Sequence, residues 1–358
     1  MSPILEISDL SVAYRTPGGD VRAVEHVNLS LNAGEVVGLC GESGSGKSTL
    51  AYGATRLLRP PAVVTSGSVR YTGRRITQGG DPVDLLTMSQ RELRTMRWRE
   101  VAIVFQSAMN ALNPVLRIQD QLLDAVHAHL RLSRHEAREK TASLLDLVGI
   151  PRNRLRSYPH ELSGGMRQRV MIAMALAADP EVVIMDEPTT ALDVVVQREI
   201  LSQVVELKET LGFAILFITH DLSLLLELAD RIAVMYAGRL METGSSRDIM
   251  RDAAHPYTMG LLNSFPSLHG PRRALAGIPG SPPDLRNPQP GCPFVPRCVH
   301  ARPACAEVDM LLAPVSGAAG PVPPGPVLPA MVSHLTACPF VTPHMSDQGQ
   351  VSQEGVLS

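Results

Sequence analysis

The feature that most constrains the fold is a glycine-rich octapeptide at residues 41–48, which has the pattern G-x-x-x-x-G-K-S. It follows the apolar run at residues 36–40 and precedes a stretch with helical periodicity from residue 47 to about residue 58. Glycines let successive backbone N–H groups turn toward bound phosphates, and the following helix adds its N-terminal dipole. A flexible loop before a helix is the alternative, but the strand–loop–helix context favours a phosphate site.

Lys47 is one of only three lysines in the chain, and all other basic residues are arginine. In a phosphate loop its ammonium would reach the β- and γ-phosphates, and the Ser48 hydroxyl would bind Mg²⁺. The residues that we expect to contact the nucleotide here are Gly41, Ser43, Gly44, Gly46, Lys47, Ser48 and Thr49.

A second motif follows the apolar residues 182–185, which end in Asp186 and Glu187. Two carboxylates after a buried strand suit a metal-holding acid followed by a water-activating base. By itself the pattern is more often an ordinary strand end. Beside a phosphate loop it predicts a nucleoside triphosphatase, with Asp186 on the Mg²⁺ side and Glu187 as the base.

Between these two motifs, Ser163, Gly164 and Gly165 precede the apolar residues 170–178. Loop amides at a helix N-terminus can form a second anion site. A serine there can equally be a simple N-cap. The spacing alone leaves both interpretations open.

The rest of the chain predicts an α/β protein. We expect strands within residues 4–31, at 101–105, 182–185 and 213–219, a hairpin over 232–242, and helix over 116–150. After about residue 268 proline and glycine become frequent. We expect no packed element at residues 313–329 and disorder over the last dozen residues.

Composition excludes several classes of protein. The chain has 358 residues, enough for two or three folding units, and its 33 Lys and Arg nearly balance 35 Asp and Glu. This balance argues against a polybasic nucleic-acid binder, and 4% aromatic residues argue against a base-stacking surface. The nine-residue apolar stretch 170–178 is too short to span a membrane, and residues 1–6 lack the features of a signal peptide. We therefore expect a location in the cytosol or on a cytosolic face.

Together these motifs resemble the ATP-binding subunits of ABC transporters. The resemblance implies that Tyr14 stacks on adenine and that Gln106 senses the γ-phosphate and contributes to the Mg²⁺ site. It implies that residues 162–165 contact ATP held by the opposite subunit. It also identifies Asp193, in Ala191-Leu192-Asp193, with the D-loop, and His220 with the switch histidine that acts with Glu187 in catalysis.

The fold implied is a P-loop NTPase with an N-terminal antiparallel β part, a parallel-sheet core, a helical subdomain and a cysteine-containing C-terminal extension. We expect an ATP-binding domain at residues 1–250, with the helical subdomain at about 107–165. An importer-type C-terminal domain at 251–345 and a disordered tail at 346–358 would follow.

Further motifs resemble the oligopeptide/dipeptide/nickel importer subgroup, namely residues 105–116, 163–169, 255–258 and 291–298. Such a subunit is an ATPase that pairs with a second, homologous ATP-binding subunit, giving a heterodimer. It lies peripherally on the cytoplasmic face of the cell membrane under two permease subunits, which a solute-binding protein feeds. The implied function is ATP-driven peptide import. Import of nickel chelates or oligosaccharides, or a soluble non-transport ABC ATPase, are the alternatives.

Four of the five cysteines, Cys292, Cys298, Cys305 and Cys338, lie in the last fifth of the chain. Their spacing is not the C-x2-C of a zinc ribbon. Four thiolates can hold a [4Fe–4S] cluster, and some relatives in the resembled family carry one at this position. Zinc and unliganded thiols are the alternatives. Cys40, next to the phosphate loop, is interpreted as a small buried residue.

Overall fold

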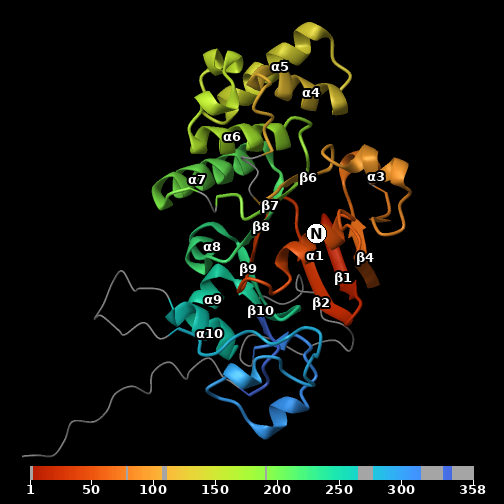
Figure 1. Cartoon of the computed structure of the whole chain (residues 1–358), viewed down its shortest axis with the longest axis vertical. Coiled ribbons are helices and arrows are strands. Elements are labelled where there is room, and N and C mark those ends of the chain that lie inside the picture. The colour runs from red at the N-terminus through yellow and green to blue at the C-terminus, as the bar shows by residue number, and fades with distance from the viewer. Residues whose placement is uncertain are drawn as a thin grey trace, which may run out of the picture.

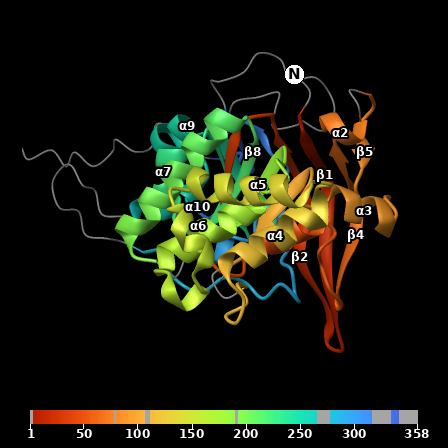
Figure 2. The same cartoon turned by 90° about the horizontal axis from the view of Figure 1, so that it is seen from above.

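Two β-sheets organise the chain. The computed structural model describes residues 3–77, 80–106, 111–189, 192–264, 277–315 and 334–340. A four-stranded antiparallel sheet has the order β2-β1-β4-β5, and an eight-stranded sheet has the order β11-β12-β10-β9-β3-β8-β7-β6. Figure 2 shows β1, β2 and β4 gathered along one side of the molecule, with α7 and α9 on the other.

The antiparallel sheet contains the predicted N-terminal strands. β1 (Leu5–Thr16) pairs with β2 (Gly19–Leu31) and, on its other side, with β4 (Ala62–Tyr71). The short β5 (Val83–Asp84) closes the sheet. Most of the apolar side chains of β1 and β2 are buried, as their alternation with polar residues predicts.

The second sheet is parallel at its centre. β3 (Val36–Cys40) lies between β9 (Arg231–Tyr236) and β8 (Ala214–Thr219), and β7 (Val182–Asp186) and β6 (Val101–Val104) continue the ladder. Every residue of these five strands is buried. Burial on both faces explains why their sequences are continuous apolar runs and not alternating ones.

Helices cover the sheets and extend beyond them (Figure 1). Their bounds are α1 Lys47–Ala54, α2 Arg74–Thr77, α3 Gln90–Met96, α4 Ile118–His129, α5 Arg134–Leu147, α6 Gly164–Ala175, α7 Val194–Leu211, α8 Leu222–Leu228, α9 Ser246–Asp252 and α10 Pro256–Asn263. Short 3₁₀ turns occur at Arg152–Arg156, Pro159–Glu161, Val295–Arg297 and Pro303–Ala306. Within the described residues, no helix combines the length and apolarity that crossing a bilayer requires.

Two helix predictions need correction. The helix that begins at Lys47 ends at Ala54 and not near residue 58, because Arg56 has a left-handed backbone with φ 54°. The helical stretch 116–150 is two helices. Leu130 is extended, and Ser133 begins α5 with a capping box in which its side chain and Glu136 bond reciprocally to backbone N–H groups.

The C-terminal region extends the core sheet. β10 (Arg239–Ser245) forms the predicted hairpin with β9 and also pairs with β12 (Leu335–Thr336), which pairs with β11 (Ala313–Pro314). The expectation of no packed element at residues 313–329 is therefore wrong at its start, because β10 offers its edge to β12, and β12 in turn offers its other edge to β11. Residues 316–329 and the last dozen residues lie outside the described residues.

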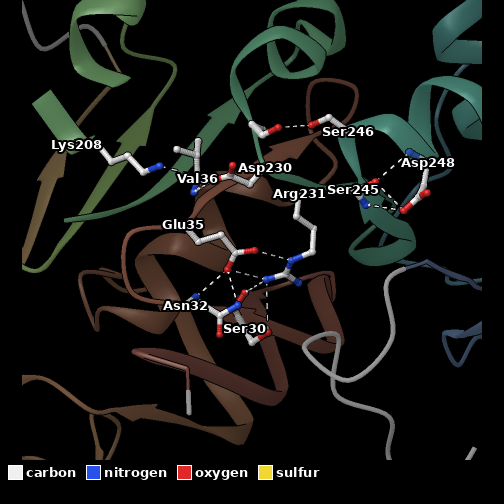
Figure 3. A network of polar contacts seen from close by, with 11 residues as sticks. Ser30, Asn32, Glu35, Val36, Lys208, Asp230, Arg231, Ser245, Ser246 and Asp248 are labelled. Atoms are coloured by element: carbon white, nitrogen blue, oxygen red, sulfur yellow. Dashed lines mark hydrogen bonds and ion pairs between the residues drawn. The ribbon is translucent and has the colours of Figure 1, made fainter. Parts of the chain in front are cut away.

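A buried polar network joins the antiparallel sheet to the core sheet (Figure 3). Arg231 begins β9 and donates from Nε to Glu35 Oε1 at 2.9 Å, and it also donates to the carbonyl of Ser30 at the end of β2. Glu35 in turn accepts from the backbone N–H of Asn32 at 2.8 Å. The Arg231 and Glu35 side chains are only 10% and 13% exposed. This ion pair therefore fixes how β2 turns into β3.

We expect Arg231→Met to lower the free energy of unfolding by about 3 kcal/mol, because it leaves Glu35 largely buried without its cation. Urea denaturation measures the change. Arg152→Met is the matched control, because the pair that Arg152 forms with Asp146 is about half exposed, and it should cost less than about 1 kcal/mol. Equal effects in the two variants would show that the buried pair has no special role.

Candidate functional site

The glycine-rich loop joins β3, at the centre of the parallel sheet, to α1. Gly41 and Gly46 have positive φ of 150° and 102°. A Cβ on Gly41 would lie 2.0 Å from the carbonyl oxygen of Met235, and one on Gly46 would lie 2.2 Å from that of Ala23. Both positions therefore require glycine for backbone conformation and for space. The loop places its amides at the N-terminus of α1, where an anion is favoured.

Lys47 folds back into this loop. Its Nζ donates to the carbonyl oxygens of Gly41 and Glu42 at 2.8 and 2.9 Å, and to Ser45 Oγ at 3.4 Å. The residue is 6% exposed, and its burial lowers the pKa of the ammonium below its usual value. The ammonium is thus held by the residues that begin the loop.

Asp186, the last residue of β7, lies against α1. Its carboxylate accepts from Ser48 Oγ at 2.9 Å and from Tyr52 OH at 2.6 Å. Burial raises the pKa of Asp186, while these two hydrogen bonds lower it. Tyr52 is not among the predicted site residues, although its place one helical turn after Ser48 puts both residues on one face of α1.

Glu187 follows β7, and its side chain is contacted by residues that follow β6 and β8. Gln106 follows β6 and donates from Nε2 to Glu187 Oε2 at 3.1 Å, and His220 follows β8 with Nδ1 3.3 Å from Glu187 Oε1. Glu187 itself has φ 43°, and its N–H donates to the carbonyl of Ile218 in β8 at 2.9 Å. The side chain of Gln106 is thus bonded to Glu187. The expected contribution of Gln106 to the Mg²⁺ site stays a prediction.

Tyr14 in β1 lies near the start of α1. Its hydroxyl is 3.0 Å from Thr49 Oγ1, and its side chain is half-buried. Both residues therefore lie beside the loop, as expected for nucleotide contacts. Stacking of Tyr14 on adenine stays a prediction.

The Ser163–Gly165 segment and Asp193 lie at the starts of neighbouring helices. Ser163 Oγ accepts from the N–H of Met166 at 3.2 Å and caps α6, while Asp193 caps α7 by accepting from the N–H of Val196 at 3.0 Å. A Cβ on Gly165 would lie 2.8 Å from Val196 Cγ1, so the two helix starts pack closely. Figure 1 shows α6 well apart from α1.

The N-cap interpretation of Ser163 is therefore correct, because this side chain satisfies a backbone N–H of α6. A second anion site at Ser163, Gly164 and Gly165 stays a prediction. Ala191, the first residue of the expected D-loop, lies outside the described residues.

The four C-terminal cysteines line one pocket. They come from two segments, and the pocket has a cavity of about 20 Å³ that His255 and Phe294 also border. Burial raises the pKa of Cys292 to about 11 and that of Cys298 above its usual value. The described residues contain no group of three or more His, Cys, Asp or Glu arranged to hold a metal ion. The expected iron–sulfur cluster is thus not confirmed. Cys40 is buried away from this pocket, as interpreted.

Comparison with known proteins identifies the family. Residues 24–190 match the ABC transporter family, and residues 241–305 match the oligopeptide/dipeptide transporter C-terminal region. The chain is 46% identical over 310 residues to the oligopeptide transport ATP-binding protein OppD of Salmonella typhimurium, covering 86% of this chain and 90% of the relative. The chain belongs to the oligopeptide/dipeptide group of ABC transporter ATP-binding proteins.

Other relatives agree with this assignment. The dipeptide transport ATP-binding protein DppD of Bacillus subtilis is 43% identical over 311 residues, with 86% of this chain and 90% of the relative covered. Among solved structures, the dimeric bacterial ABC transporter cassette MJ0796 matches with a TM-score of 0.59 and 27% identity, over 68% of this chain and 99% of that one. The predicted fold class is confirmed, and the chain is an ABC ATPase.

The loop geometry gives a direct test. We expect Gly46→Ala to lower the free energy of unfolding by more than about 2 kcal/mol, because its Cβ collides with the Ala23 carbonyl at a left-handed position. Gly18→Ala is the control. Its Cβ would meet nothing within 4 Å, so its effect should stay within about 0.5 kcal/mol. Denaturant unfolding of both variants decides the matter, and a harmless Gly46→Ala would contradict the close approach.

Proposed function

We propose that this ATPase energises the import of peptides through an ABC transporter in the cytoplasmic membrane. The observation that carries the proposal is the meeting of Gln106, Glu187 and His220 beside the phosphate loop. It occurs in a chain whose C-terminal region matches that of oligopeptide/dipeptide transporters. The names of the relatives, oligopeptide and dipeptide transport proteins, support peptides as the solute.

In this proposal the loop amides and Lys47 bind the phosphates of ATP. Ser48 Oγ and Asp186, which lie 2.9 Å apart, would hold Mg²⁺, since oxygen donors suit this ion and Mg²⁺ neutralises phosphate charge. Glu187 accepts a proton from the attacking water. Gln106 and His220 orient the Glu187 carboxylate through one contact to each of its oxygens.

The partners proposed are a second, homologous ATP-binding subunit, two permease subunits and, through them, a solute-binding protein. Ser163 caps α6, and α6 lies apart from α1 in Figure 1, which suits contact of Ser163, Gly164 and Gly165 with ATP held by a facing subunit. Such a subunit would lie on the cytoplasmic face of the membrane. The bulk charge of −2 gives no support for a nucleic-acid partner.

Peptide uptake tests the proposal. In liposomes holding the assembled transporter, ATP should drive accumulation of labelled di- and oligopeptides. We expect Glu187→Gln to bind ATP but hydrolyse it at least about 100-fold more slowly, because the base is lost. Lys47→Ala should bind ATP at least about tenfold more weakly. Lys140→Ala, which removes a lysine paired with the exposed Asp179, is the control and should match wild type.

Three outcomes would contradict these assignments. Hydrolysis by Glu187→Gln near the wild-type rate would show that Glu187 is not the base. Uptake of nickel chelates or oligosaccharides without peptide uptake would replace the proposed solute, and ATP hydrolysis without any permease partner would favour a soluble ATPase.

We also propose that Cys292, Cys298, Cys305 and Cys338 bind a [4Fe–4S] cluster. Four thiols around one pocket match the ligand number of such a cluster. His255, which is 1% exposed, accepts the N–H of Tyr257 at its Nδ1, so its Nε2 bears a proton. That Nε2 has no hydrogen-bond partner, which suits a sulfur acceptor in the pocket. The cavity of about 20 Å³ is small, so the cysteine segments must move apart to bind a cluster.

Metal analysis tests the cluster. Protein purified without oxygen should contain about four iron and four sulfide per chain. Cys298→Ser should lose the iron and the visible absorption band, whereas Cys40→Ser should keep both because Cys40 lies outside the pocket. About one zinc per chain would identify a zinc site instead, and the absence of both metals would mean that the thiols are unliganded.

A further inference from the structure

The C-terminal region forms hydrogen bonds to the phosphate loop at Glu42. The Glu42 carboxylate receives both terminal nitrogens of Arg297, at 2.6 and 2.9 Å. The two residues are 255 positions apart in the sequence. A paired arrangement of this kind fixes direction as well as distance, and it is stronger than a single neutral hydrogen bond.

Arg297 is held in place by further contacts. Its Nε donates to the carbonyl of Pro279 at 2.7 Å, and one terminal nitrogen donates to Tyr236 OH at 3.2 Å. The side chain is only 5% exposed, and the hydrogen bonds to Glu42 raise the pKa of the guanidinium further above its usual value. Arg297 is therefore a fixed cation whose donors are engaged by the protein itself. These contacts indicate a structural partner of the loop and not a ligand-binding arginine.

A second residue of the C-terminal region, Tyr257, contacts the backbone of Glu42. The N–H of Glu42 donates to Tyr257 OH at 2.9 Å. Tyr257 is fully buried, and its ring packs against Tyr236 and Phe294, with centroid distances of 4.6 and 5.3 Å. Both the side chain and the main chain of Glu42 are thus fixed by the C-terminal region.

The position of Glu42 controls the position of Lys47. The carbonyl of Glu42 accepts from Lys47 Nζ at 2.9 Å, next to the bond from Lys47 to the carbonyl of Gly41. A chain of contacts therefore runs from Arg297 and Tyr257, through Glu42, to the ammonium at the proposed phosphate site.

We propose that Arg297 and Tyr257 are positioning residues for ATP binding. They hold the first part of the phosphate loop, at Glu42, in the conformation that receives the phosphates, so that the loop need not be ordered when ATP binds. The proposal adds to the proposed function a role for the C-terminal region at the ATP site. It does not depend on the identity of the solute or on a metal in the cysteine pocket.

Titration of the full chain with a non-hydrolysable ATP analogue and Mg²⁺ tests this role. We expect Arg297→Gln to weaken binding about tenfold, because it removes the buried cation that pairs with the partly buried Glu42 carboxylate and so frees the loop. Arg286→Gln is the control. Its guanidinium lies in the same region but pairs with Asp284 at an exposed position, so binding should stay within about twofold of wild type.

The double variant Glu42→Gln/Arg297→Gln separates positioning from charge neutralisation. If Arg297 only cancelled the charge of Glu42 near the phosphates, the uncharged pair would bind the analogue as wild type does, and that result would overturn the proposal. Positioning predicts that the double variant stays weakened to about the same extent as Arg297→Gln, because both lose the same pair of charged hydrogen bonds.

Tyr257→Phe tests the second contact with little change of packing. It keeps the ring against Tyr236 and Phe294 and removes only the acceptor for the N–H of Glu42. We expect the variant to bind the ATP analogue severalfold more weakly than wild type. Its thermal unfolding midpoint should stay within about 4 °C of the wild-type value. In the assembled transporter, both single variants should raise KM for ATP and leave kcat within about twofold.

The readouts keep this test separate from that of the proposed function. Wild-type binding by both Arg297→Gln and Tyr257→Phe would overturn the proposal even if peptide uptake succeeds. Lost kcat with unchanged KM would also overturn it, since positioning for binding acts on affinity. Should Arg297→Gln fail to fold, Tyr257→Phe decides the matter alone.

Discussion

The parallel pairing of β3 with its neighbours is the constraint on which the structure depends. β3 is buried on both faces between β8 and β9, and β7 and β6 extend the same ladder. Parallel strands end on the same edge, so the loop after β3 and the residues that follow β6, β7 and β8 come together there. Segments far apart in the sequence, at Gln106, Glu187 and His220, meet for this reason.

Charge burial at that edge is balanced locally. Lys47 is surrounded by loop carbonyls, Asp186 accepts from two hydroxyls, and Glu42 is paired with Arg297. A buried charge without such partners costs several kcal/mol, so each group is tied to the element that supplies its partner. The site is consequently ordered by contacts from the sheet, from α1 and from the C-terminal region together. Because the loop is already ordered, ATP binding does not have to offset the entropy cost of ordering it.

Much of the fold and site could be predicted because the relevant signals are local. Continuous apolar runs predicted the central strands of the core sheet. The motif at residues 41–48 predicted the phosphate loop, and the motif at Asp186 predicted the end of a buried strand. Tyr52 was predictable in principle from its helical spacing to Ser48. The break at Leu130 was missed because an amphipathic pattern continues across it, whereas the capping box at Ser133 begins a new helix. β11 was missed because its partner β12 is distant in sequence.

The sequence by itself determined that the chain has a phosphate loop between a buried strand and a helix, since glycine spacing, strand burial and helix start are all set within a few residues. It also determined the family, through motifs spread along the chain. Only the tertiary structure decided that Arg297 pairs with Glu42 and that four cysteines border one pocket. Arg297 and Glu42 are 255 positions apart, and Cys338 is separated from the other three cysteines by a long intervening segment. No local propensity encodes these contacts, and they arise only when the C-terminal region packs against the end of the core sheet.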